Sequence, residues 1–256
     1  MRDVDFTYAA YEELLDTCLD GRFDCFTVRE YIQRLESTSH SLPDRFLILC
    51  HDIDRKPRNA LAIARIEAEY EVQSTYYTRT IEKTFQPDIV ERIDSLGHEV
   101  GYHYEDVDRT GGDLNAASQS FAENLSMLRQ HVTVDTVCPH RNPLTAHDNR
   151  ALWRNITFEA NDLLGDAIHS IDADVAYFSD AGRTWRHEDH TVPEHATDIE
   201  AHTTFELMDL LATERIERAC LHSHPNRWAG SYPELIFEHA KDTAANMVKH
   251  GLNVVT

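Results

Sequence analysis

Segments typical of β-strands alternate with amphipathic helical segments along most of the chain, and this alternation restricts the fold more than any other feature. It favours a parallel sheet or barrel with helices packed outside it. The sequence predicts strands over 46–50, 72–78, 99–104, 132–139, 175–180, 218–224 and 252–256. Apolar residues at helical spacing predict helices over 57–70, 87–97, 115–131, 204–214 and 232–250. We therefore expect an α/β protein.

The chain of 256 residues contains no repeat, low-complexity tract or linker. This length suits one large domain. We predict a single domain over residues 1–256, with residues 1–44 as an N-terminal helical extension packed on a barrel. The stretch 150–200 is irregular, and we expect it to supply either a substrate lid or a subunit contact.

The net charge of −21 argues against a nucleic-acid partner, because phosphates are repelled by a chain with 45 acidic and 24 basic residues. The acidic excess indicates a halophilic protein from a salt-rich cell interior, with an acidic mesophilic enzyme as the alternative. No apolar run is long enough to cross a bilayer, and the N-terminus does not resemble a secretory signal. Five cysteines without a CxxC pair suit a reducing compartment, so we expect a cytoplasmic protein.

Four of the predicted strands end in polar clusters that contain histidine. The clusters are His51-Asp52-Ile53-Asp54, His103-Tyr104-Glu105-Asp106, His140-Arg141-Asn142-Pro143 and His222-Ser223-His224-Pro225. In a parallel α/β barrel the carboxyl ends of the strands lie on one face, where active sites are built from the following loops. We therefore expect these distant clusters to converge on a single site.

Asp52 and Asp54 are the most informative pair in these clusters. If the strand continues to Asp54, its period of two places both carboxylates on the same side, where they repel each other. A divalent cation or a shared proton would remove that repulsion, and zinc or another first-row metal suits carboxylate and histidine ligands. The alternative is a helix-capping aspartate with Arg55 and Lys56 as ion-pair partners.

The clusters, taken in order, resemble the polysaccharide deacetylase superfamily, carbohydrate esterase family 4, from about residue 45 to residue 228. The similar segments are HDID (51–54), GHEVGYH (97–103), RNPL (141–144), DAGRTW (180–185) and LHSHP (221–225). The resemblance implies a distorted (β/α) barrel that hydrolyses N- or O-acetyl groups on sugars with a bound divalent metal.

The first three motifs carry the implied base and metal site. By resemblance, Asp52 is the general base, and Asp54 and His103 bind the metal. Arg141 would line the groove and orient the base.

The last two motifs carry the implied acid and the substrate groove. His224, preferred to His222, would be the general acid. The trio of Asp180, Arg183 and Trp185 would bind the substrate. Trp185 and Trp228 could stack on sugar faces, although core packing explains both tryptophans equally well.

Val107 departs from the family pattern, which has a second metal-binding histidine at this position. His98 is too far along the strand to replace it. The third ligand would then be Glu105, Asp106 or Asp108, or His140 or His222 from a neighbouring strand; otherwise the site binds metal weakly or not at all. We favour His140, because adjacent strands bring its loop close to that of His103, and zinc as the metal.

The expected function is hydrolysis of an N-acetyl group on a sugar or carbohydrate precursor. A less characterised branch of the superfamily, similar in GHEVGYHYE, DNRALW and HPNRW, implies a role in surface-polysaccharide biosynthesis. Two alternatives stay open: a metal-independent hydrolase of cyclic amides, and a carbohydrate-binding relative that has lost catalysis. The sequence leaves the sugar and the oligomeric state undetermined.

Overall fold

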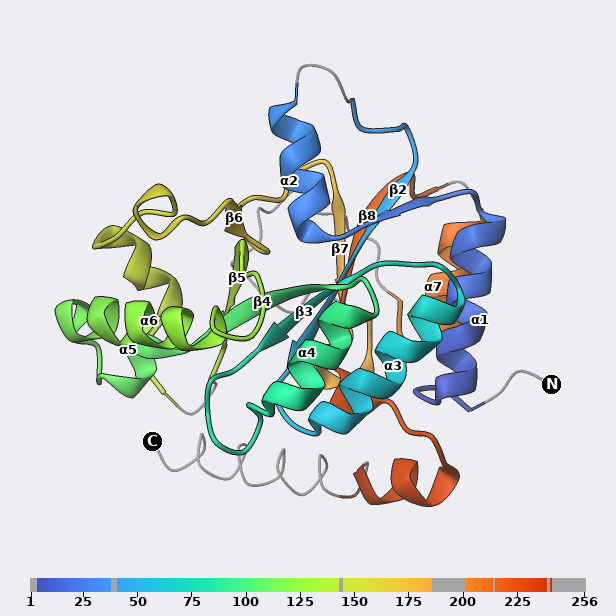
Figure 1. Ribbon diagram of the computed structural model, residues 1–256. Helices are drawn as coiled ribbons and strands as arrows, with labels where there is room; N and C mark the ends of the chain where they lie inside the picture. Colours follow the sequence, from blue (N-terminus) through green and yellow to red (C-terminus); the bar gives the residue numbers. More distant parts are fainter. Residues whose placement is uncertain are drawn as a thin grey trace.

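The computed structural model describes residues 4–37, 41–142, 145–185, 201–213, 215–238 and 240. One parallel sheet has the strand order β6-β5-β4-β3-β2-β8-β7, and β1 pairs with β2 beside β3 (Figure 1). The two end strands, β6 and β7, are not paired with each other among these residues, and the sheet curls into a half-barrel surrounded by helices. This is the distorted barrel that the sequence predicts.

The strands are β1 (Asp24–Phe26), β2 (Phe46–Ile53), β3 (Thr75–Thr78), β4 (Glu99–Tyr104), β5 (Thr136–Pro139), β6 (Gly165–Asp166), β7 (Ala176–Ser179) and β8 (Arg218–Ser223). The α-helices are α1 (Tyr8–Asp20), α2 (Val28–Glu36), α3 (Pro57–Glu69), α4 (Pro87–Ser95), α5 (Asp106–Arg109), α6 (Leu114–Leu128) and α7 (Thr204–Ala212). The predicted helix over 232–250 is helical at 232–238, its later part lies mostly outside the described residues, and so does the predicted strand 252–256. None of the helices among the described residues has the length and apolar character that a bilayer crossing requires.

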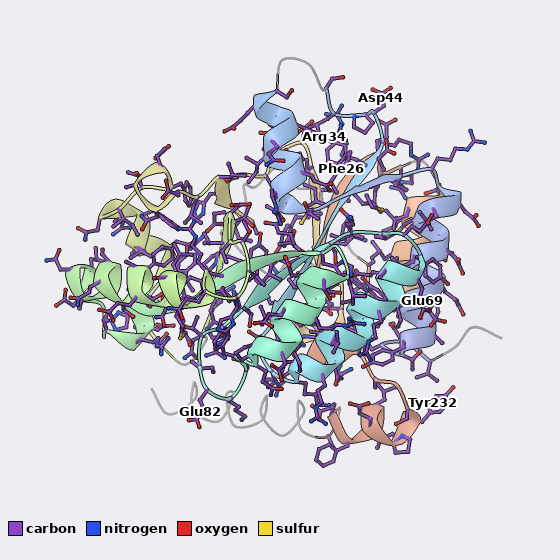
Figure 2. The ribbon with its side chains drawn as sticks, in the orientation of Figure 1. Phe26, Arg34, Asp44, Glu69, Glu82 and Tyr232 are labelled. Atoms are coloured by element: carbon purple, nitrogen blue, oxygen red, sulfur yellow. The ribbon has the colours of Figure 1, made fainter. Side chains whose placement is uncertain are left out.

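The N-terminal segment is not wholly helical, which corrects our expectation for residues 1–44. Between α1 and α2, β1 adds a strand to the sheet along the first half of β2. Phe26 at the end of β1 packs into the barrel core, and the guanidinium carbon of Arg34 lies 4.5 Å from its ring centre (Figure 2). The segment therefore contributes to the barrel as well as covering it.

Alternation along β2 decides which side chains face the barrel interior. Phe46, Ile48 and Cys50 belong to the interior apolar cluster, whereas Leu47 and Leu49 pack in the layer between the sheet and the outer helices. Helices α3 and α4 lie side by side in that layer, and α1 lies beside α7 (Figure 1). Continuing the period of two past Cys50 directs the next even-numbered residues, Asp52 and Asp54, to the interior mouth.

The two ends of the barrel have different surroundings. In Figure 2, Asp44 marks the end at which the chain enters β2, and Glu82 marks the loop after β3 at the opposite, carboxyl end. Helix α2 supplies Val28, Tyr31 and Ile32 to the interior cluster. Apolar packing therefore fills much of the interior below the carboxyl end, together with buried Glu99 and its donors Thr75 and Thr136.

A buried carboxylate lies in the outer layer, away from the mouth. Glu67 on α3 is fully buried and accepts hydrogen bonds from Tyr11 (2.6 Å), Ser74 (2.6 Å) and Tyr76, and its Oε1 lies 2.8 Å from Nε2 of His51. Burial alone would raise the pKa of Glu67, but His51, and then His98 and the Ser74 hydrogen bond, lower it to about 2. Glu67 therefore remains charged at neutral pH and ties α1, α3 and β2 together.

We expect Glu67→Ala to lower the free energy of unfolding by about 3–5 kcal/mol, because it leaves buried polar partners uncompensated. Since the folded pKa lies below the ordinary value of 4.5, the charge contribution is present above that pH and is lost as the pH falls towards 2. Urea unfolding measures both effects. The matched control is the exposed Glu69→Ala on the same helix, with a change within about 0.5 kcal/mol; equal values for the two variants would contradict this role.

Candidate active site

Strand alternation brings the predicted site residues to the interior side of the carboxyl ends. Cys220 on β8 and Cys138 on β5 belong to the interior cluster, so His222 and His140, two residues later, follow the same direction. On β4, Tyr102 and Tyr104 pack in the outer layer, which leaves His103 inside. Polar groups from β2, β4, β5 and β8 thus meet at one mouth.

Asp54, His103 and His140 form a cluster in which the candidate ligand atoms all lie within 4.8 Å of one another. Oδ1 of Asp54 lies 3.4 Å from Nε2 of His103 and 3.5 Å from Nε2 of His140. This Oδ1 is buried and has no hydrogen-bond partner among the described residues. Ligands bound about 2.0–2.1 Å from a tetrahedral zinc ion lie roughly 3.3 Å apart, so the donor set and its spacing fit the expected metal.

The two histidines of this cluster are held by groups behind them. Nδ1 of His103 donates to the carbonyl oxygen of Cys138 at 3.0 Å, which turns Nε2 towards the aspartates. Burial alone would lower the pKa of His103, but Asp52 and Asp54 raise it, so a metal ion would displace a proton here.

His140 has a carboxylate on its other side. Its Nδ1 lies 3.5 Å from Oε2 of Glu105, which is paired in turn with Arg79. Burial, and then the neighbouring His103, lower the pKa of His140 to about 3. The ring is therefore neutral, as a metal ligand must be.

Asp52 lies beside this cluster, surrounded by three histidines. Its Oδ1 lies 2.9 Å from Nε2 of His222, and its Oδ2 lies 3.4 Å from Nε2 of His103 and 3.9 Å from Nε2 of His224. Burial alone would raise the pKa of Asp52, but the charges of His103 and then His222 lower it below its ordinary value. Asp52 is therefore ionised, as a general base must be.

His224 is fixed by Asp180, and the substrate-binding role that we expected for this aspartate stays a prediction. Asp180 is fully buried, its Oδ1 lies 2.6 Å from Nδ1 of His224, and both its oxygens accept from the His224 backbone N–H, at 3.1 and 3.0 Å. Trp228 donates to Oδ2 at 3.1 Å. A buried carboxylate with these partners orients the imidazole and leaves its Nε2 facing Asp52.

The two tryptophans are buried and Arg183 contacts the backbone, and the contact with substrate that we expected of them stays a prediction. Trp185 and Trp228 are 1% and 0% exposed, and Trp185 donates to Oγ1 of Thr204 at 3.0 Å. Arg183 donates to the carbonyl oxygen of Arg227 at 2.8 Å. Of the two explanations for the tryptophans, core packing is the one that the structure supports.

Arg141, which we expected to orient the base, is exposed. The charges that lower the pKa of Asp52 most come from His103 and His222. The role of Arg141 therefore stays a prediction from the resemblance alone.

The residues expected as third ligand in place of Val107 differ in their surroundings. Val107 is 2% exposed in the outer apolar layer. Asp106 is occupied by hydrogen bonds from Tyr102, Ser120 and Asn124, and Asp108 by bonds from Thr145 and Asn149. His140 is the residue that completes the cluster with Asp54 and His103.

A second group, Asp52, Cys138 and His222, also has candidate ligand atoms within 4.8 Å of one another. Burial raises the pKa of the Cys138 thiol well above its ordinary value. Burial alone would lower the pKa of His222, but Asp52 raises it to about 9. A cation would have to displace a proton from both the thiol and the imidazole of this group, but from His103 alone among the histidines of the first group, so this group is less suited to a metal.

Sequence reasoning gave too little weight to His222 and missed Tyr177. The hydroxyl of Tyr177 on β7 lies 2.6 Å from Nδ1 of His222. The spacing of His222 and His224 indicates that both face the site, since residues two apart on a strand face the same side. No local sequence pattern marks Tyr177, because its partner lies 45 residues away.

No family model matches the sequence, and no curated protein matches it either. Solved structures do resemble the chain. One is a CE4 family pseudoenzyme of Bacillus anthracis in a mutant form with restored enzymatic activity, at 12% identity and a TM-score of 0.48. That match covers 78% of this chain and 64% of the other, so this chain spans less than two thirds of that protein's length.

Two further structures match larger shares of their own chains. A CE4 esterase of Streptococcus mutans has 13% identity and a TM-score of 0.47, over 85% of this chain and 89% of the other. The Xyl-CE4 domain of a multidomain xylanase, from the hindgut metagenome of Trinervitermes trinervoides, has 16% identity and a TM-score of 0.43, over 78% and 85%. Each of these three solved structures is described as a CE4 protein.

Proposed function

We propose that this protein is a metal-dependent hydrolase that removes an N-acetyl group from a sugar or a sugar-containing precursor. One observation carries the proposal: a cluster suited to a cation, an ionised carboxylate and an aspartate-held histidine meet at one mouth. Nε2 of His224 lies 3.9 Å from Oδ2 of Asp52 and 4.0 Å from Oδ2 of Asp54. These are the parts that hydrolysis of an amide requires: a base, an acid and a site that stabilises negative charge.

Asp54, His103 and His140 would hold the metal ion. Two imidazole nitrogens and one carboxylate oxygen suit zinc, and related first-row ions accept the same donors. When bound, such an ion acts as a Lewis acid that polarises the acetyl carbonyl and makes water more acidic.

The remaining residues would move the protons. Asp52 accepts a proton from the attacking water, since it is ionised and faces the metal ligands. His224 donates a proton from Nε2 to the leaving amine, because Asp180 occupies its Nδ1 and fixes the ring. A role in surface-polysaccharide biosynthesis is part of the proposal, and rests on the motif resemblance.

Acetate release from a panel of N-acetylated sugars, nucleotide-linked sugars and short oligosaccharides tests this function. We expect turnover by the metal-loaded protein, loss of more than about 90% of it after chelation, and recovery with one equivalent of zinc, cobalt or manganese. Turnover that chelation does not affect would contradict the metal dependence and favour a cyclic-amide hydrolase. Sugar binding without any turnover would contradict the enzyme and favour a binding protein.

A further inference from the structure

The proposed mechanism leaves His222 without a role, although it makes the shortest ion-pair contact of the general base. Nε2 of His222 and Oδ1 of Asp52 lie 2.9 Å apart, and both residues are at least 94% buried. Among the described residues these two atoms form an ion-pair contact, and neither has a hydrogen-bond partner. A buried carboxylate oxygen requires a compensating partner, and the His222 ring is the group in place to provide it.

The His222 ring is itself held from its other side. Tyr177 on the neighbouring strand β7 places its hydroxyl 2.6 Å from Nδ1. Burial raises the pKa of Tyr177 well above its ordinary value, so the hydroxyl keeps its proton. The His222 ring also stacks on the His224 ring, with 5.8 Å between centres and 12° between planes. A tyrosine, a histidine and the base thus form one connected row from three adjacent strands.

We propose that His222 is the positioning residue of the general base, and that Tyr177 fixes its ring. The inference rests on the proposed function. By holding Oδ1 of Asp52, His222 leaves Oδ2 directed towards His103 and His224, where the metal ligands and the acid lie. In this chain His222 would thus supply the orientation that the motif resemblance assigned to Arg141.

Two other arrangements compete with this one. The first gives the positioning role to the exposed Arg141, as the motif resemblance implies. The second treats Asp52, Cys138 and His222 as ligands of a second cation. This arrangement would require His222 to lose a proton, although both ring nitrogens lie close to Asp52 and Tyr177. It would also make Asp52 a metal ligand, so that Asp52 could not act as the base.

Steady-state kinetics of His222→Leu, His222→Gln and Tyr177→Phe, each loaded with metal, test the proposal. We expect His222→Leu to lower kcat roughly 10- to 100-fold with KM within about twofold, because a charge-assisted contact to the base is lost. Glutamine keeps an N–H donor and should recover part of that loss, roughly 3- to 10-fold. Tyr177→Phe should lower kcat by less than His222→Leu. Unfolding and metal content measured on the same samples separate these effects from misfolding.

Four outcomes would overturn the positioning role. These are kcat of the wild-type value in His222→Leu, equal losses in the leucine and glutamine variants, a loss in Arg141→Ala at least as large as in His222→Leu, and a second metal equivalent that Cys138→Ser removes. Failure of the proposed function is a different result: the wild-type protein itself would release no acetate from any substrate in the panel. Wild-type turnover combined with an unaffected His222→Leu variant would overturn this inference alone.

Discussion

Asp52→Asn is expected to lower kcat by roughly 10²–10⁴-fold while the protein keeps its metal, because an asparagine cannot accept the proton of the attacking water. The burial and charge of Asp52 make the effect of this variant interpretable. Asp52 is 6% exposed, and its pKa lies below its ordinary value, since the histidine charges outweigh the burial that alone would raise it. Asparagine keeps the size of the side chain and removes its charge and basicity, so the packing of β2 should be retained.

Kinetics and metal analysis on the same Asp52→Asn preparation check this prediction. The matched control is Asp44→Asn, an exposed position at the opposite end of β2, for which we expect an unchanged kcat (Figure 2). Wild-type turnover in Asp52→Asn would remove the base from the mechanism. Loss of metal in this variant would instead make Asp52 a ligand.

Asp54→Ala is expected to abolish both metal binding and turnover. Loss of a partner behind a ligand typically weakens metal affinity 10- to 100-fold, so loss of this ligand should weaken it by more than about 100-fold. Oδ1 of Asp54 lies within 3.5 Å of both histidine nitrogens of the cluster, which makes it the oxygen that completes the donor set. Metal titration followed by calorimetry measures the affinity directly.

His140→Ala is the companion variant, since we propose His140 as the third ligand. We expect a loss of affinity of the same order as in Asp54→Ala. Cys138→Ser is the control, because its thiol belongs to the less suited group and should leave the affinity unchanged. Affinity that survives Asp54→Ala, or falls in Cys138→Ser, would move the metal away from the proposed cluster.

The parts of this site that follow from strand periodicity could be predicted from the sequence. Once β2 is assigned, a period of two directs Asp52 and Asp54 inward together, and a parallel order brings His103 and His140 to adjacent strands. The proximity of His140 to Asp54 and His103 followed from the same adjacency. These features depend on short-range regularity, which a sequence displays.

The parts that depend on packing between distant segments could not be predicted in the same way. The sequence around Trp185 and Trp228 is equally consistent with a substrate groove and with core packing. Their packing in the structure depends on contacts with Thr204, Phe6 and Tyr11, which lie far away in the sequence. Asp180 lies 44 residues from the His224 that it fixes. The sequence analysis missed β1 because a strand of three residues is too short to show an alternating pattern. The position of Phe26 depends on packing against Phe46, which lies 20 residues later in the sequence.

X-ray absorption spectroscopy of the zinc-loaded protein tests the central claim most directly, because it identifies the atoms bound to the ion. We predict one zinc per chain with two imidazole nitrogens and carboxylate oxygen in its shell, and no sulfur. The spectrum of Asp54→Ala should show loss of this shell, whereas that of Asp52→Asn should keep it. A zinc–sulfur distance near 2.3 Å, or the absence of bound zinc in the wild-type protein, would contradict the account.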